Sequence, residues 1–398
     1  MKRRYILAGT LAFYLLWVKG QDKDTFKLSE TQIDIVYNQY VQDGDNSAVT
    51  GGEGTERLTI YGPSFKINHS FGKNSIGIQL GTDVISSAST DNIDDIVSSV
   101  SRLDARSYAD ISYTRFLEQN RTQITAGLSL SIESDYYSEG KFISASRTSP
   151  NKNTTFSASF QAFNDDLRWG RLEGGLLKDP VELIYPAELR FKEWYDEVKR
   201  NTYTLNLGVS QVIDARNKMG LYGLLTLQDG LLATPFHRVY FNDGSLAVEQ
   251  LPDSRTKIGL AIKWNSFISG KVILRNTVNG YVDDFGIQSV SLDHETSVKL
   301  DARWALSPSL RFYTQKASKY FAPKDQHDVS ENFYTSDFDL SNFQSYALGF
   351  AVAHTPFGKN HKATRDFTLR YNYYGRSNSL TSHAVSFRLG IRSRPKKQ

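Results

Sequence analysis

One long segment of this sequence places a histidine beside an arginine and aromatic residues, a combination that can bind ligands. Residues 229–254 contain Phe236, His237, Arg238 and Tyr240. A cationic side chain next to aromatic rings can bind an anion or a planar molecule. Alternatively, the same side chains pack the segment against other loops, because aromatic rings are readily buried. We therefore favour packing over ligand binding, and the segment is a candidate plug or partner surface.

A second long segment, residues 166–199, is rich in aromatic and apolar side chains. It contains Arg168, Trp169, Arg171 and Trp194. Disordered loops lack such residues, so we expect this segment to fold, either as a constriction or as a cover for the structure that holds it. It too is a candidate plug or partner surface, and a solvated loop is the alternative.

Clustered aspartates give one weak candidate for a metal site. Asp91, Asp94 and Asp95 offer oxygen donors of the kind that a hard cation prefers. Their spacing is not that of an EF-hand loop, and acidic turns are common on protein surfaces. The surface-turn interpretation is therefore favoured, and no cofactor is predicted.

The signatures of common hydrolases are absent from the sequence. Neither H-E-x-x-H nor G-x-S-x-G occurs, and the seven histidines are scattered. The chain has no cysteine, which excludes disulfides, thiolate metal sites and cysteine nucleophiles. The net charge of +4 is modest, with no basic run before the C-terminal tail, so nucleic acid is not an expected partner. An enzyme would need a serine or an aspartate that the fold brings to a histidine.

The elements that would position these residues show a strict alternation of side chains. One stretch, for example, alternates Ile258, Leu260, Ile262 and Trp264 with small or charged residues. Successive side chains of a β-strand point to opposite faces, so each such stretch is a two-sided strand. In residues 288–304 the second face is charged, which fits a water-filled or hydrogen-bonded lumen better than the core of a soluble sandwich.

The same alternation turns a set of charged side chains inward in the last six strands. Opposed acidic and basic walls would create a transverse field in a pore. Alternatively, the charges pair with one another and fill a closed lumen. The inward-facing set is Arg275, Asp293, Glu295, Lys299, Asp301, Arg303, Arg311, Asp366, Arg370, Arg388 and Arg392.

About sixteen strands can be placed along the chain, separated by connections of two kinds. Short polar turns follow every even strand, whereas the long connections all follow odd strands. This asymmetry predicts an all-β, transmembrane, antiparallel up-and-down barrel with short periplasmic turns, long outer loops and both termini in the periplasm. The strands are expected at 31–42, 57–70, 75–87, 105–117, 122–133, 140–148, 154–165, 200–213, 219–228, 255–264, 271–281, 288–304, 309–319, 343–355, 364–374 and 382–393, and the long loops at 43–56, 88–104, 166–199, 229–254 and 320–342.

The N-terminus has the pattern of a secretory signal. Three basic residues at 2–4 precede an apolar run at 5–17, which is shorter than a membrane-spanning helix requires. We expect a signal peptide at 1–20 and a single barrel domain at 21–398. The predicted location is the outer membrane of a diderm bacterium.

Five segments spread along the chain are typical of one protein family: TDNIDDIVSSVSRLDARSY from Thr90, FNDDLRWGRL from Phe163, IYP-ELR-KEW from Ile184, GLLATPFHRVYFNDGSL from Gly230 and FYTSDFDLSNFQ from Phe333. Together they resemble the domain of unknown function 3570 family of bacterial outer-membrane proteins. The resemblance implies an outer-membrane barrel and brings no established activity or catalytic residues. Members are encoded beside a small lipoprotein, a thioredoxin-like protein and a flavin transferase, so the resemblance also implies partners in an envelope redox system.

We expect this barrel to be a pore or a small-molecule transport barrel. The alternative is a plugged barrel that anchors or scaffolds an envelope complex, which the long aromatic loops favour. A membrane-embedded hydrolase is the second alternative. The expected partners are outer-membrane lipid, the barrel-assembly machinery and, through the resemblance, the lipoprotein and redox proteins.

Overall fold

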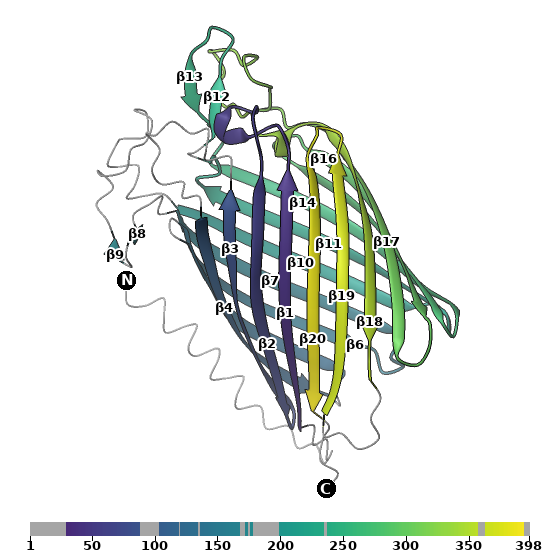
Figure 1. The fold of residues 1–398 in the computed structure, drawn as a ribbon. Coiled ribbons are helices and arrows are strands. Elements are labelled where there is room, and N and C mark those ends of the chain that lie inside the picture. Colours follow the sequence, from purple (N-terminus) through teal and green to yellow (C-terminus); the bar gives the residue numbers. More distant parts are fainter. Residues whose placement is uncertain are drawn as a thin grey trace, which may run out of the picture.

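Sixteen antiparallel strands close into a barrel in the computed structural model of the chain (Figure 1). Each strand pairs with the next barrel strand along the chain, and β1 closes the barrel against β20. The described residues are 29–87, 103–118, 120–133, 136–167, 172–173, 176–177, 199–234, 237–356 and 363–393. The barrel strands are β1 (Ser29–Asp43), β2 (Leu58–Phe71), β3 (Asn74–Ser87), β4 (Leu103–Leu117), β5 (Thr122–Ile132), β6 (Tyr136–Thr148), β7 (Thr154–Leu167), β10 (Lys199–Val212), β11 (Asn217–Gly230), β14 (Ser254–Ser269), β15 (Val272–Asp283), β16 (Gln288–Lys299), β17 (Trp304–Gln315), β18 (Phe343–His354), β19 (Ala363–Arg376) and β20 (Thr381–Ser393).

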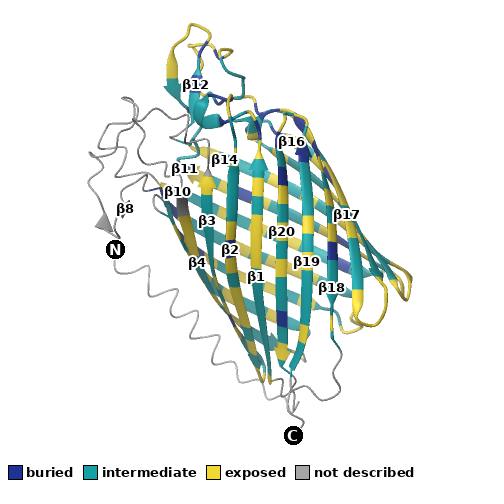
Figure 2. Cartoon of the chain, viewed as in Figure 1, coloured by how far each residue is buried: buried dark blue, intermediate teal, exposed yellow. Residues whose placement is uncertain are grey.

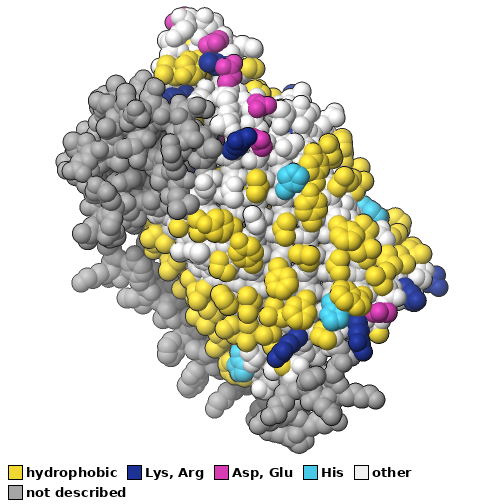
Figure 3. All heavy atoms as spheres, in the orientation of Figure 1, with side chains coloured by type: hydrophobic (Ala, Val, Ile, Leu, Met, Phe, Trp, Pro, Cys, Tyr) yellow, Lys and Arg dark blue, Asp and Glu magenta, His cyan; other side chains and the backbone are white. Residues whose placement is uncertain are grey.

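The predicted fold class is confirmed, because the alternating strands form a wall with one apolar and one polar face. On β10 every outward side chain between Asn201 and Gln211 is apolar: Tyr203, Leu205, Leu207 and Val209. Ten residues of strand rise about 33 Å, or about 25 Å along the axis of a barrel with strands tilted by about 40°. This height matches the apolar band of a membrane barrel, and hydrophobic side chains cover much of the barrel wall that Figure 3 shows.

The two ends of the barrel differ in the connections that close them. Short turns close the end opposite the label β13 in Figure 1, and both β1 and β20 have their terminal ends there. At the other end, the residues between β1 and β2, between β11 and β14, and between β17 and β18 pack together. We call this structure the cap; it comprises residues 44–56, 231–234, 237–253 and 316–342 and contains η1 (Ala48–Thr50), β12 (Arg238–Tyr240), β13 (Leu246–Val248) and η5 (Phe338–Leu340).

The largest fully buried side chains lie in or beside the cap, while Figure 2 shows that single buried positions also occur along the barrel strands. Phe285, in the connection between β15 and β16, is 2% exposed, while Val239 and His327 lie in the cap itself. No helix among the described residues is long and apolar enough to cross a membrane.

One predicted strand was too long. The alternation at 288–304 continues in the sequence, but β16 ends at Lys299 and β17 begins at Trp304 rather than at residue 309. Asp301 accepts hydrogen bonds from the backbone N–H groups of Arg303 (2.6 Å) and Trp304, which closes a short turn. Asp301 and Arg303 therefore lie in this turn and not on the inward face of a strand, because an aspartate that binds its own turn overrides the alternating pattern.

Several predicted residues and segments lie outside the described residues. They are the signal peptide at 1–20, most of the loops at 88–104 and 166–199, and the side chains of Asp91, Asp94, Asp95, Arg168, Trp169, Arg171, Trp194 and Phe236. Within 166–199 the structure describes only its ends and the two-residue strands β8 (Leu172–Glu173) and β9 (Leu176–Leu177), which pair with each other.

Candidate functional site

The lumen contains open space on the side formed by β5 to β15. Inward side chains there are mostly small, so they do not meet across the interior. The lining of the resulting cavity, of about 520 Å³, includes apolar residues such as Leu224 and Ala261 together with Ser144, Ser157, Ser159, Asn206, Gly259, Asn279, Tyr222 and Tyr281. Hydroxyl and amide groups of this kind hydrogen-bond water and small polar solutes.

A second cavity, of about 720 Å³, combines aromatic rings with charges. The aromatic rings belong to Tyr108, Tyr136, Phe142 and Phe163, and the charged side chains to Lys66, Asp83, Arg106, Asp110 and Asp165. Asp165 accepts a hydrogen bond from the hydroxyl of Ser138 (2.7 Å) and pairs with the guanidinium of Arg200 (2.9 Å). Pockets that bind small molecules share this mixture of apolar rings and a few fixed polar groups.

Sequence reasoning did not select this second cavity, although a signal for it exists. Phe142 and Phe163 occupy inward positions, out of phase with the outward Ile143 and Phe160 of the same strands. An aromatic ring on the polar face of an alternating strand is the pattern that marks such a site.

Most of the charged residues predicted to face the lumen lie together on one wall and form ion pairs. Arg275 binds Glu295 (2.6 Å), and Arg370 reaches the same carboxylate (3.6 Å). Arg311 pairs with Asp293 (3.5 Å). Of the two alternatives drawn from the sequence, the structure therefore favours paired charges over separate acidic and basic walls.

The contact between Arg370 and Glu295 spans two intervening strands, because β17 and β18 separate β19 from β16. Inward positions on β17 and β18 are small there, for example Ser309, Gly349 and Ala351. Arg370 can therefore lie flat over them, so that its guanidinium remains at the wall instead of crossing the lumen.

Arg388 joins the first strand of the barrel to the last two. Its guanidinium on β20 donates to Asp34 on β1 (2.9 Å) and to Asp366 on β19 (2.5 Å). Nearer the strand ends, Arg392 pairs with Glu30 (3.2 Å). Lys299 is the last residue of β16.

In the ion pairs of Arg275 and Arg311, the guanidinium group is more exposed than its carboxylate partner. Side-chain exposure is 52% for Arg311 against 36% for Asp293, and 44% for Arg275 against 24% for Glu295. A solute in the lumen therefore meets guanidinium groups more readily than carboxylates on this wall.

The described aromatic residues of segment 229–254 pack within the cap. This agrees with the interpretation of the sequence in which these side chains pack against other loops. The ring of Tyr240 lies against Gly51, where an added Cβ would be 2.5 Å from the ring and where φ is +79°. The ammonium group of Lys324 lies over the same ring at 4.9 Å from its centre. Arg238 and Tyr240 form the ends of β12, whose middle residue Val239 is fully buried.

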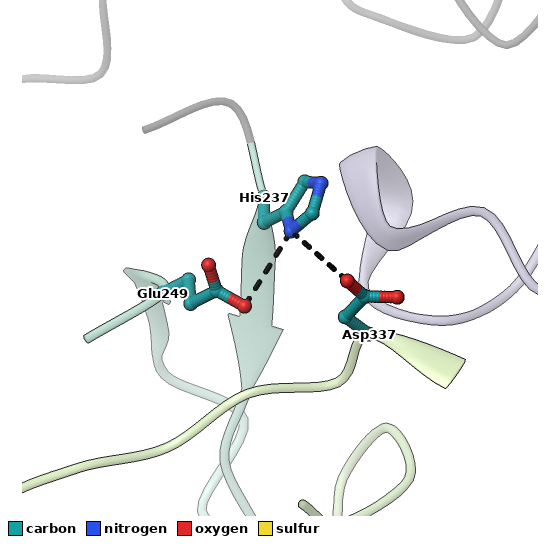
Figure 4. Close-up of side chains that lie close together, drawn as sticks. All are labelled: His237, Glu249 and Asp337. Atoms are coloured by element: carbon teal, nitrogen blue, oxygen red, sulfur yellow. Dashed lines mark hydrogen bonds and ion pairs between the residues drawn. The ribbon is translucent and has the colours of Figure 1, made fainter. Parts of the chain in front are cut away.

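A cluster that sequence reasoning captured only in part lies beside β12 (Figure 4). His237 Nδ1 is 3.4 Å from Glu249 Oε1 and 4.0 Å from Asp337 Oδ2. The side chains are 19%, 2% and 25% exposed, respectively. His237 was a predicted site residue, but Glu249 and Asp337 were not, because only the folding of two separate loops brings them to the histidine.

The cluster strongly affects the ionisation of its members. Burial lowers the pKa of His237, but the Glu249 and Asp337 carboxylates outweigh it and raise the pKa above its usual value. Burial raises the pKa of Asp337 to about 6. For Glu249 burial acts in the same direction, but its contacts with His237 prevail and lower the pKa.

Comparison with known proteins gives one family and a general likeness of shape. The family model described as "Protein of unknown function (DUF3570)" matches residues 93–385. No curated protein matches the sequence of this chain.

Among solved structures, a bacterial polysaccharide outer membrane secretin matches with a TM-score of 0.46 and 10% identity, over 94% of this chain and 100% of that chain. A BenF-like porin from Pseudomonas fluorescens Pf-5 gives a TM-score of 0.42 and 9% identity, over 90% and 98%. Pseudomonas aeruginosa OccK1 (OpdK) gives 0.41 and 8%, over 91% and 98%. At these values the likeness concerns the general barrel shape alone.

Proposed function

Because this chain belongs to the DUF3570 family, whose description states no function, we propose a function from its own barrel: an outer-membrane pore for small polar molecules. The observation that carries this proposal is the lumen. A closed wall with an apolar outer face encloses cavities of about 520 and 720 Å³, whose linings combine hydroxyl, amide and charged groups with apolar surface. An apolar band needs lipid outside, and a polar lumen needs water or polar solutes inside.

Aromatic residues on the outer face support the membrane location. Trp304, His354 and Phe367 form a row of ring contacts near the end with short turns, with centroids 4.2 and 6.4 Å apart. Tyr346 and Tyr373 contact each other towards the other end. Amphipathic rings gather at the two interfaces of membrane barrels, so these levels fit the two edges of a bilayer.

A plugged scaffold is the second candidate, and the cap is the observation that favours it. Three connections far apart in the sequence are packed into one structure at one end of the barrel, which offers a rigid surface to a partner. Conductance separates the two candidates. The refolded barrel in a planar bilayer should give discrete open steps if it is a pore, and a barrel that never conducts would support the scaffold.

The direction of insertion can be tested with single cysteines, since the natural chain has none. We expect Val329→Cys, at an exposed position of the cap, to react with a membrane-impermeant maleimide on whole cells. Gly270→Cys, in the short turn between β14 and β15 where no atom crowds an added Cβ, should react only after the outer membrane is opened. Outer loops are long and periplasmic turns short in such barrels. If only Gly270→Cys were labelled on intact cells, the barrel would have the opposite orientation, with the cap facing the periplasm.

A conducting barrel should prefer anions modestly, because guanidinium groups are the more exposed members of the lumen network. Replacing Arg311 and Arg370 by serine frees the Asp293 carboxylate and removes two cations, so the reversal potential in a salt gradient should shift towards cation preference. High salt should reduce the difference by screening.

Arg216→Ser is the matched control for this change, since Arg216 lies in the turn after β10 and not on a strand facing the lumen. It should leave selectivity unchanged. A cation-selective wild type, or equal shifts in the control and the double variant, would show that these arginines do not line the conducting path.

A further inference from the structure

The cluster of His237, Glu249 and Asp337 has the donor set of a metal site. Each residue offers one ligand atom, and the three atoms lie within 4.8 Å of one another. One imidazole nitrogen and two carboxylate oxygens suit zinc and other divalent transition metals. Figure 4 shows the second ring nitrogen of His237 turned away from both carboxylates, so Nδ1 is the atom that faces the common space.

The two distances from His237 to the carboxylates are near the spacing of a tetrahedral site. Ligand bonds of about 2.0–2.1 Å place neighbouring donors about 3.3 Å apart. The 3.4 Å from His237 Nδ1 to Glu249 Oε1 already has this length. The 4.0 Å from Nδ1 to Asp337 Oδ2 requires a shift of less than about 1 Å, which the partly exposed Asp337 side chain can make. Three protein donors leave a fourth position for water.

Hydrogen bonds from the surrounding chain already hold both carboxylates in place. Glu249 accepts the N–H of Thr234 (2.6 Å) and the hydroxyl of Thr335. The Thr335 hydroxyl also accepts the N–H of Asp337 (3.0 Å), and the Asp337 carboxylate accepts the N–H of Asp339 (2.9 Å). Outer hydrogen bonds that orient ligands in this manner are a regular feature of metal sites.

In the part of the chain that the structure describes, the cluster contains more acidic than basic groups. Two carboxylates face one imidazole, which can supply at most one positive charge. The neighbouring cations Arg376 and Lys324 bind Asp339 (2.6 Å) and Glu53 (2.9 Å) instead. Glu249 is 2% exposed, and a buried carboxylate needs a close positive partner.

We propose that His237, Glu249 and Asp337 bind one divalent transition-metal ion, with Zn²⁺ as the probe, and that the ion ties two loops of the cap together. His237 and Glu249 belong to the connection between β11 and β14, and Asp337 to that between β17 and β18. A bound ion would thus join segments that are about 90 residues apart in the chain. The inference is independent of whether the barrel conducts.

The experiment titrates the purified full-length barrel, without an affinity tag and after chelator treatment, with Zn²⁺ against a chromophoric chelator. One equivalent should bind to the wild type. Asp337→Asn should weaken binding by about 100-fold or more, since even loss of outer-shell partners commonly costs 10–100-fold. This variant should still fold, because the asparagine oxygen can accept the same N–H of Asp339. Glu249→Gln should have a similar effect on affinity.

Glu331→Gln is the matched control. Glu331 contacts His327 (2.7 Å) elsewhere in the cap, so the variant removes a cap carboxylate beside a histidine without touching the proposed ligands. It should bind Zn²⁺ as the wild type does. X-ray absorption of the zinc-loaded wild type should show only nitrogen and oxygen ligands at about 2.0 Å. Absence of stoichiometric binding to the wild type, or undiminished binding to Asp337→Asn, would overturn the proposal.

Discussion

Leu207→Arg is expected to prevent correct assembly of the barrel, whereas Asn206→Arg should not. Leu207 is 54% exposed on the outer face of β10, near the middle of the apolar band whose edges are marked by the polar residues Asn201 and Gln211. An arginine on the lipid face near the middle of the bilayer costs about 2–4 kcal/mol. Asn206 points into the cavity of about 520 Å³, where a charged side chain has room and water.

The two adjacent variants differ only in which face carries the charge, so each controls for the other. Folded membrane barrels migrate faster than unfolded ones in unheated detergent gels, and the folded fraction in isolated outer membranes is the measurement. We expect a large loss for Leu207→Arg and a wild-type level for Asn206→Arg. Equal tolerance at both positions would mean that the outer face of β10 does not meet lipid.

Phe285→Ala should loosen the cap from the barrel rim, at a cost of about 3–5 kcal/mol in local stability. Phe285 is 2% exposed, stacks edge-to-face on Tyr320 (5.2 Å) and carries the guanidinium of Arg255 over its ring at 4.4 Å. Its carbonyl also accepts the hydroxyl of Ser318 (3.0 Å). Truncation leaves a cavity where the residues from Ser318 onwards rest on the connection between β15 and β16.

Faster tryptic cleavage at Lys319 and Lys324 should report this loosening, while the barrel itself stays heat-modifiable. Phe333→Ala is the matched control, because Phe333 contacts the same Tyr320 ring (5.7 Å) but is 38% exposed. It should change the cleavage rate much less. Similar rates for both variants would show that Phe285 does not hold the cap.

Alternation was sufficient to locate the strands because a membrane barrel imposes it on both faces of every strand. Alternation gave the wrong strand end at 300–303. There the alternating residues form a turn, which Asp301 closes by accepting hydrogen bonds from backbone N–H groups. The predicted strands also left residues 305–308 as a connection, yet these residues lie inside β17, where Pro308 is opposite Phe350.

Sequence reasoning could place side chains on a face but could not pair them. The inward position of Arg370 follows from counting, whereas its reach to Glu295 depends on small residues on two other strands. For the same reason, the sequence identified His237 as a candidate site residue but did not identify Glu249 and Asp337 as its partners. Their approach depends on how two loops fold over each other, and no periodic pattern records that.

The ion pairs of Arg388 bear on the order in which the barrel forms. Hairpins of neighbouring strands are local and form early, whereas β1 and β20 meet across nearly the whole chain, as in the pair of Gln32 and Arg392. Closing so long a loop costs entropy, and until it closes both edge strands present unpaired N–H and C=O groups. Arg388 on β20 donates a hydrogen bond to Asp34 on β1, so a charged contact stabilises the strand pair with the largest sequence separation. Of all the strand pairs in the barrel, β1 and β20 therefore carry the largest loop-closure cost.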